Sequence, residues 1–225
     1  FMVLGIAPEI QAQQDEENSI RNSPIYRIQA AVYNRAIKYS DVNQAITALY
    51  NMCVLDPQND SILYNLAFLY FDQQNYISSV MTLNDVMMLN SNNLNAQEMK
   101  AISLDRLGAK DKALEEYESL YLKNNDINFL YKVAFSQYEL KRFKECITNI
   151  NIMLEGSVVD EELLIFADAE NQQQEIPMRA SLLNLRALVE QDQGNKEEAR
   201  RYFNEALEIA PEFYLGKENL KKLDE

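Results

Sequence analysis

The sequence contains no histidine and no tryptophan, and among its 225 residues only five are glycine, five are proline and two are cysteine. Because histidine is the commonest general base and the commonest metal ligand, its absence argues against the usual acid–base catalysis and against most metal sites. The scarcity of glycine and proline leaves long stretches without a helix breaker. This favours helices over many short strands joined by turns.

The two cysteines give no sign of redox or metal chemistry. Cys53 and Cys146 lie far apart, and neither belongs to a Cys-X-X-Cys pair. This excludes a zinc site or a thioredoxin-like dithiol of the usual spacing. Both occupy apolar positions of expected helices, so we expect them to be buried as small hydrophobic residues.

The charge is strongly negative. The net value is −14, from 21 basic and 35 acidic residues, with no run of lysine or arginine. Such a surface repels a phosphate backbone, so the sequence predicts no nucleic-acid partner, and solubility is the simplest explanation of the charge. No stretch reaches the ~20 apolar residues of a membrane span, so we expect no membrane insertion of the mature chain.

Motifs of catalysis are also missing. There is no phosphate-binding loop, dinucleotide fingerprint, nucleophile elbow or calcium loop. The acidic residues are scattered over expected solvent-facing helix positions. A pair of carboxylates would suffice for a glycosidase, but nothing singles out such a pair. The sequence therefore predicts a protein that is not an enzyme, with no catalytic residues, no cofactor and no metal.

The N-terminal residues look like the end of a secretory signal. Residues 1–7 (FMVLGIA) are apolar and a polar segment follows, so cleavage after Ala12 would make Gln13 the first mature residue. Pro8 interrupts the apolar run and Ile10 replaces the usual small residue, which argues the other way. We expect export to the periplasm or cell envelope, with a cytoplasmic location as the alternative.

The leader is expected to continue into a flexible flank. Residues 13–22 are polar and predicted to be disordered, so residues 1–22 are assigned to the leader and flank. Ser23 and Pro24 then form a helix start, with serine as the N-cap and proline at the first helical position.

An internal repeat organises the rest of the chain. Small residues, which we call anchors, recur at intervals of 34, 34 and 33 residues, and then after 53, which is one repeat plus about 19 residues. The anchors are Ala45, Ser79, Ala113, Cys146 and Ala199. Larger apolar residues mostly follow four and seven positions later, and a residue that is usually alanine stands twelve positions earlier.

This pattern resembles the tetratricopeptide repeat, a 34-residue unit of two antiparallel helices, here of the bacterial type. The resemblance covers about residues 26–225 and departs from the family in the absence of tryptophan and in the ring of Tyr33 at a usually small site. The best single unit, residues 180–211, carries Leu183, Ala187, Gly194, Ala199, Phe203, Ala206 and Pro211 in the family's register.

The resemblance implies an all-α fold: a right-handed α-solenoid of five helix-turn-helix repeats within residues 23–225, ending in a capping helix. The repeats are expected at about 26–59, 60–93, 94–126, 127–156 and 180–211, with an insertion at 157–179 and the cap at 212–225.

The insertion does not follow the repeat. Residues 163–166 look extended, residues 169–171 look like a turn, and apolar residues then alternate with polar ones up to Pro177. This predicts a short β-hairpin, with Pro177 at an edge strand or at the start of a helix. An irregular loop with a partial helix is the alternative.

Partner binding follows from the resemblance, because the first helix of each repeat in this family lines a concave groove. The second and fourth repeats each place three aromatic residues there, which predicts an apolar groove for an extended or helical peptide. Alternatively, these rings pack against a neighbouring helix or the insertion. The predicted groove residues are Asn34, Lys38, Tyr64, Phe68, Phe71, Tyr131, Phe135, Tyr138 and Leu188.

The function expected from this reading is a non-catalytic scaffold that binds another protein or a peptide. The acidic tail of a chaperone is not an expected ligand, because Ala30, Asn95 and Met99 stand where that clamp needs lysine or arginine. Two alternatives stay open: a self-assembling structural module, which would make the chain a homo-oligomer, and an accessory domain of an envelope enzyme system.

Overall fold

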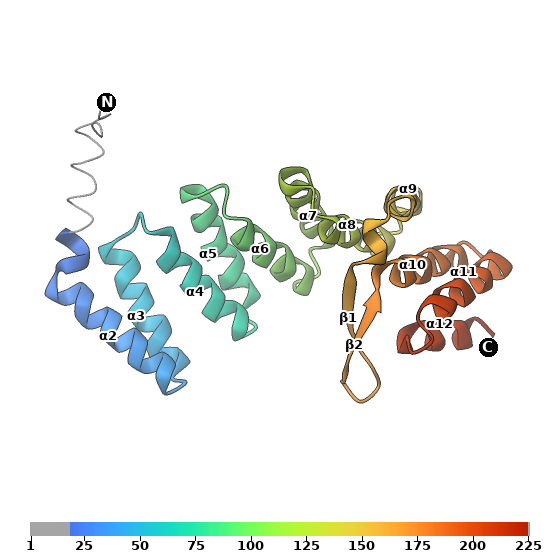
Figure 1. Ribbon diagram of the computed structural model, residues 1–225. Helices are drawn as coiled ribbons and strands as arrows, with labels where there is room; N and C mark the ends of the chain where they lie inside the picture. The colour runs from blue at the N-terminus through green and yellow to red at the C-terminus, as the bar shows by residue number, and fades with distance from the viewer. Residues whose placement is uncertain (1–18, 225) are drawn as a thin grey trace, which may run out of the picture. The chain divides into compact units, whose positions relative to one another are not determined.

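The computed structural model describes residues 19–224, which form helices apart from one short hairpin (Figure 1). Two compact units share them: unit 1 ends at Ala109 and unit 2 begins at Lys110. Unit 1 contains α2 (Pro24–Lys38), α3 (Val42–Leu55), α4 (Asp60–Asp72), α5 (Tyr76–Leu89) and α6 (Leu94–Arg106). Unit 2 contains α7 (Lys110–Asn124), α8 (Ile127–Glu139), α9 (Phe143–Glu155), a 3-10 turn η1 (Val158–Asp160), β1 (Leu163–Ala167), β2 (Gln173–Pro177), α10 (Met178–Asp192), α11 (Lys196–Ile209) and α12 (Tyr214–Asp224).

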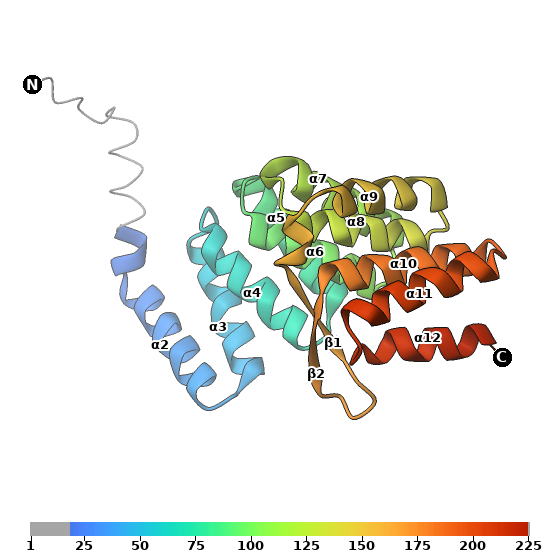
Figure 2. The same ribbon diagram turned by 45° about the vertical axis from the view of Figure 1, so that its right-hand side comes forward.

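Helices that follow one another in the chain pack side by side within each unit. In unit 1, α2 contacts α3, α4 contacts α5, and the first helix α4 also contacts the first helix α6. In unit 2, α8 contacts both α9 and α10, and α10 contacts α11, which contacts the capping helix α12 (Figure 2). The helix-turn-helix repeats, the cap and the hairpin are all present, so the predicted all-α repeat fold is confirmed. The boundary between the units divides the third repeat, which gives α6 to unit 1 and α7 to unit 2.

Burial explains the spacing of small residues in the sequence. All five anchors are fully buried in second helices, because a small side chain there lets neighbouring helices approach closely. The alanines twelve positions before the anchors, Ala67, Ala101, Ala134 and Ala187, are fully buried as well. Tyr33, which stands at this position of the first repeat, is only partly buried against the cluster formed by α2, α3 and α4.

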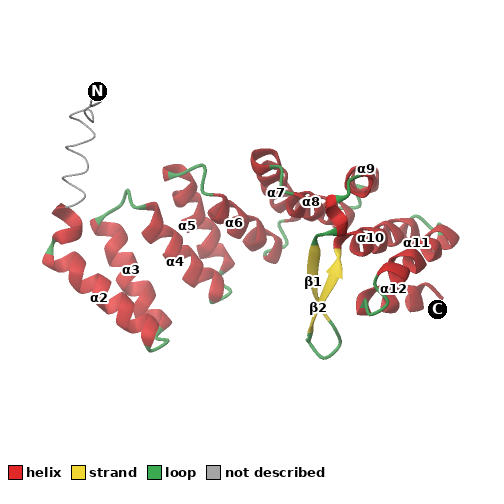
Figure 3. Cartoon of the chain, viewed as in Figure 1, coloured by secondary structure: helices red, strands yellow, loops and turns green. Residues whose placement is uncertain are grey.

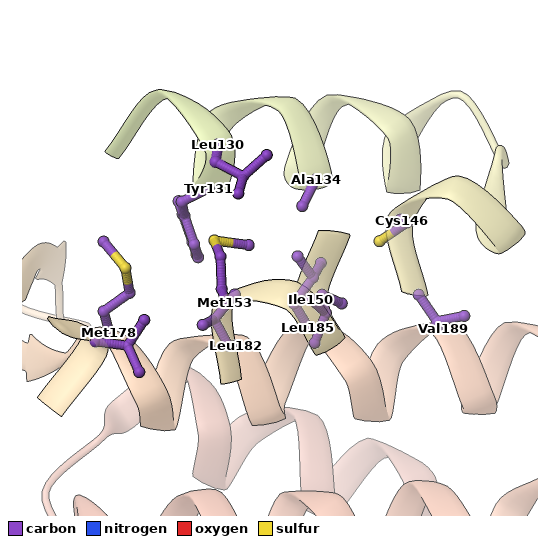
Figure 4. Close-up of a cluster of buried hydrophobic side chains, with 11 residues drawn as sticks. Leu130, Tyr131, Ala134, Cys146, Ile150, Met153, Met178, Leu182, Leu185 and Val189 are labelled. Atoms are coloured by element: carbon purple, nitrogen blue, oxygen red, sulfur yellow. The ribbon is translucent and has the colours of Figure 1, made fainter. Parts of the chain in front are cut away.

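The core of unit 2 shows this packing in detail (Figure 4). Residues of α8, α9 and α10 meet there, and Ile150 and Met153 of α9 lie between the other two helices. Val159 of η1 and Met178 at the start of α10 complete the cluster. The two ends of the insertion are therefore part of this core.

A residue with positive φ stands two positions after the end of each first helix and five positions before the next anchor: Ser40, Gln74, Gly108, Lys141 and Gly194. The following amide then donates a hydrogen bond to a carbonyl five residues back, as from Asn195 to Glu190 at 2.8 Å. This is the bonding of a Schellman motif, which satisfies a carbonyl left unpaired at the helix end. Glycine adopts this backbone without strain, but three of the five turns use other residues.

The insertion forms the predicted β-hairpin, shown in yellow in Figure 3. β1 and β2 are antiparallel, with Leu163 opposite Pro177 and Ala167 opposite Gln173. Arg179, in the first turn of α10, donates hydrogen bonds to the carbonyl oxygens of Leu154 and Gly156 at the end of α9. The hairpin is thereby tied to the helix that precedes it.

The N-terminal flank differs from the sequence prediction. Residues 19–22 are helical rather than disordered, and the Arg21 guanidinium contacts the buried Asp56 carboxylate with Nε 2.9 Å from Oδ2. Ser23 caps α2 as predicted, its hydroxyl oxygen accepting from the amide of Tyr26. An ion pair to the end of α3 thus orders the last part of the expected flank. The predicted signal remnant, residues 1–12, lies outside the described residues.

Candidate protein-binding surface

The predicted groove residues all lie on first helices, but their exposure differs. Asn34 and Lys38 on α2 are exposed, and Leu188 on α10 is partly buried against the cluster formed with α11 and α12. Two phenylalanines are exposed despite their large apolar rings: Phe68 of α4 at 49% and Phe135 of α8 at 41%. Exposed aromatic rings beside a well-packed core are candidates for contacts with a partner.

Phe68 and Phe135 belong to a set of three aromatic residues that occurs once in each unit. We call each set an aromatic trio. The trio of unit 1 is Phe68, Phe71 and Tyr76, and the trio of unit 2 is Phe135, Tyr138 and Phe143. Each residue of the second trio stands 67 residues after its counterpart, which is the length of two repeats (34 and 33). The two trios therefore occupy equivalent positions.

In unit 1 the trio joins a first helix to the second helix that follows it. The rings of Phe71 and Tyr76 meet edge to face, with centroids 5.6 Å apart and planes at 70°. Phe71 also packs against the cluster around Leu83. This is a favoured aromatic geometry, so it fixes the part of α4 that presents Phe68.

In unit 2 the corresponding rings also pack together. The centroid of Tyr138 lies 6.3 Å from that of Phe143 and 6.5 Å from that of Phe135. The Tyr138 hydroxyl hydrogen-bonds to Asp192 at the end of α10, and burial together with this carboxylate raises the pKa of Tyr138. Tyr138 therefore connects α8 to α10 and supports the ring of Phe135. It is a packed residue more than a free anchor.

Tyr131, one of the predicted groove residues, is buried instead of exposed. Tyr131 is only 8% exposed and belongs to the core of unit 2, between α8 and α10 (Figure 4). Burial raises the pKa of its hydroxyl far above the ordinary value. Its counterpart Tyr64, 67 residues earlier, is partly buried and lies near Glu98 of α6. A binding partner could not reach Tyr131 without opening this core.

Tyr76 and Phe143 were missed by the sequence reasoning. The family's groove is lined by first helices, whereas these two residues begin second helices. The signal was present in the repeat, because both stand three positions before an anchor. Comparing this position across repeats would have found them.

Nothing in the described residues suggests a catalytic centre. Over residues 19–224 no three or more acidic or cysteine side chains are placed to hold a metal ion. Burial raises the pKa of the Cys53 thiol to about 11 and that of Cys146 to about 12, so both are protonated near neutral pH and are poor nucleophiles. No helix within that range is long and apolar enough to cross a membrane.

Comparisons with known proteins agree with this architecture. The family model described as "Tetratricopeptide repeat" matches residues 180–213, which contain α10 and α11. No curated protein sequence matches the chain.

Several solved structures resemble most of the chain. YrrB, described as a TPR protein with an unusual peptide-binding site, matches with a TM-score of 0.67 and 15% identity over 93% of this chain and 97% of its own. MamA matches with a TM-score of 0.63 and 16% identity over 81% of this chain and 90% of its own. A tetratricopeptide repeat protein from Parabacteroides merdae matches with a TM-score of 0.50 and 17% identity over 96% and 81%. At such identities these likenesses show the fold alone.

Proposed function

We propose that this chain, which has the fold of tetratricopeptide repeat proteins, is a non-catalytic scaffold that binds a partner protein or peptide along its first helices. Proteins with this fold are interaction modules, and YrrB is described as having a peptide-binding site. The proposal assigns the main contacts to Phe68 in unit 1 and Phe135 in unit 2.

One observation carries this proposal: each unit exposes a phenylalanine at the same repeat position, beside a ring pair that is packed. Burying a phenylalanine side chain stabilises a complex by roughly 1.5–3 kcal/mol. A ring on a rigid helix loses little conformational entropy on binding, so most of that energy is available for affinity. Aromatic residues with these properties are typical binding hot spots.

The chemistry of the partner follows from the same residues. Phe68 and Phe135 would contact apolar or aromatic side chains of the partner, as when a peptide inserts such side chains into an apolar groove. The exposed Asn34 and Lys38 on α2 add polar groups that can bond a peptide backbone or an acidic side chain. The partner is therefore expected to combine apolar anchors with ordinary polar groups.

A crosslinked capture experiment tests this function. The full chain is immobilised and exposed to extract of the source cells, in parallel with the double variant Phe68→Ala, Phe135→Ala and with Leu122→Ala. Leu122 lies on α7 and is even more exposed, so it controls for the loss of an exposed apolar side chain. Circular dichroism checks that each variant is folded.

A protein captured by the native chain and by Leu122→Ala, but lost from the double variant, supports the proposal. Equal capture by all three would place the contact elsewhere. If no partner is captured and the mass of the native chain rises with concentration, the chain is a self-assembling module instead.

We also propose that the chain is exported. Support comes from the apolar start of the sequence and the polar residues after Ala12. Sequencing the N-terminus of the protein from fractionated source cells tests this, with Gln13 expected first in the envelope fraction. An uncleaved protein in the cytoplasmic fraction contradicts it.

A further inference from the structure

Unit 1 contains a groove on its second helices, away from the aromatic trio. A cavity of about 410 Å³ lies between α3 and α5 and is lined in part by Leu63 and Leu66 of α4. A second cavity of about 320 Å³ continues it toward Pro57 and Met88. The two share Cys53, Leu63 and Asp85 as lining residues, so they form one groove, which we call the α3–α5 groove. Its size is in the range of sites that bind small molecules or peptide side chains.

The borders of the α3–α5 groove are apolar and exposed. Val54 on α3 and Met81 and Met88 on α5 are each more than half exposed, as is the ring of Tyr50. Exposed apolar residues gathered around a groove mark an interaction site more often than isolated ones do. Methionine is flexible and polarisable, so it adapts to differently shaped apolar partners.

The second helices of unit 2 do not share this character. α3 has no charged residue and α5 has only Asp85, whereas α7, α9 and α11 each carry glutamate together with lysine or arginine. The repeat does not require an apolar outer surface here, because α7 and α11 occupy the corresponding position with charged residues. The difference therefore needs an explanation specific to unit 1.

Charge indicates what would cover the groove. No lysine or arginine occurs between residues 39 and 99, the region that supplies every residue lining the groove. The acidic residues in this region are Asp41, Asp56, Asp60, Asp72, Asp85 and Glu98. Asp85 is exposed and is the one charged side chain that lines the described groove. A cationic ligand would meet attraction with no opposing positive charge from this region.

We propose that the α3–α5 groove binds a partner segment in which aliphatic side chains are flanked by lysine or arginine. The aliphatic groups fill the groove over Leu63 and Leu66, and a cation pairs with Asp85. This surface is on second helices, so the inference does not rest on the function proposed for the first helices.

Two other occupants fit the groove less well. Residues 1–18 begin with an apolar run but contain four acidic residues and no lysine or arginine, so they would bring like charge to Asp85. A second copy of the chain carries a net charge of −14 and would meet the same repulsion at long range. Both are distinguished by the test below.

The probe is a synthetic amphipathic peptide of leucine and lysine, about five helical turns (~18 residues) long. Matched peptides contain leucine and glutamate, or lysine with serine in place of leucine. Fluorescence anisotropy measures binding of each peptide to the full chain, to the double variant Val54→Gln, Met81→Gln and to the control variant Leu122→Gln. Glutamine keeps the charge constant, and all three positions are exposed, so the fold should not change.

Cys53 supplies a second readout, because its half-buried thiol lines both cavities while Cys146 is buried in unit 2. We expect the leucine–lysine peptide to slow alkylation of Cys53 by at least about fivefold. The affinity for this peptide should fall roughly tenfold or more in the double variant Val54→Gln, Met81→Gln, but should not change in Leu122→Gln. Asp85→Asn should weaken binding and reduce its dependence on salt.

Several results would overturn the proposal. Equal binding of the leucine–lysine peptide to the native chain and to the double variant Val54→Gln, Met81→Gln would contradict binding in this groove. Equal binding of the serine–lysine peptide would contradict the need for aliphatic side chains, and equal binding of the leucine–glutamate peptide would contradict the need for a cation. Loss of self-association in that variant, with no peptide binding, would make a second copy the occupant. If deletion of residues 1–18 speeds Cys53 alkylation and the peptide does not compete, the chain's own N-terminal segment fills the groove.

Discussion

The rings of Phe166 and Phe213 lie 5.1 Å apart between their centroids, which joins strand β1 to the turn before the capping helix α12. Gln174 of β2 holds the same junction, because its amide group donates to the Glu212 carbonyl and its side-chain oxygen accepts from the Tyr214 amide. The insertion thus packs on the turn between the last repeat and the capping helix.

We predict that Phe213→Ala destabilises unit 2 strongly. Phe213 is fully buried between the hairpin and the last helices, and replacing such a phenylalanine typically costs about 3–5 kcal/mol. Urea denaturation followed by circular dichroism measures the change. Ile165→Ala is the matched control, because Ile165 points out of the opposite face of β1 and should change stability by less than about 0.5 kcal/mol. Similar losses in both variants would contradict this packing.

A substitution in the turn after a first helix is predicted to increase stability. Lys141 and Gly194 occupy the same repeat position, with φ of 58° and 84°. The left-handed backbone costs a non-glycine residue about 1–2 kcal/mol of folding free energy, and glycine removes this strain. Part of the gain is lost, because a glycine makes the unfolded chain more flexible and so stabilises the unfolded state.

Lys141→Gly should therefore raise the free energy of unfolding by roughly 0.5–1 kcal/mol. Gly194→Ala should lower it by roughly 1–2 kcal/mol, although an added Cβ would meet no neighbour. Shifts in the urea midpoint at constant slope would measure both effects. A loss of stability in Lys141→Gly would show that the lysine side chain contributes more than its backbone costs.

The thiols give a prediction about pH. Burial raises the pKa of the Cys53 thiol from 9.0 to about 11, so its thiolate is scarce at pH 8. Alkylation of folded Cys53 at pH 8 should be roughly 100-fold slower than in the urea-unfolded chain and should rise about tenfold per pH unit up to pH 10.

The same shift links stability to pH. A thiol whose folded pKa is raised keeps its contribution to stability below about pH 9 and loses it as the pH rises through about 11. The alkylation experiment has a built-in control, since Cys146 is fully buried and should react only on unfolding. Rapid alkylation of folded Cys53 at pH 8 would contradict the burial of this thiol.

The sequence predicted the repeat because burial at fixed spacing leaves a direct mark on residue size. Ala113 and Ala187 are small since another helix lies against them, and this constraint recurs every repeat. The hairpin was also predictable, because alternation of apolar and polar residues reflects the two faces of a strand. Such local patterns depend on near neighbours in the chain.

Features that depend on distant segments were not predictable in the same way. Tyr131 looked like a groove residue by its position, but Val159 and Met178, on either side of the hairpin within the insertion, belong to the cluster that buries it. The repeat containing its counterpart Tyr64 is followed by no such insertion. Likewise, the polar composition around Arg21 predicted disorder, since it does not reveal the buried carboxylate of Asp56 35 residues away.

The proposed binding through the first helices is tested most directly by the affinity of a captured partner for the native chain and its variants, measured by isothermal titration calorimetry. We predict that Phe68→Ala and Phe135→Ala each weaken binding by about 2 kcal/mol or more, roughly 30-fold, whereas Leu122→Ala leaves the affinity within about twofold. Unchanged affinity in both phenylalanine variants, with their folds intact, would contradict a scaffold that binds through its first helices.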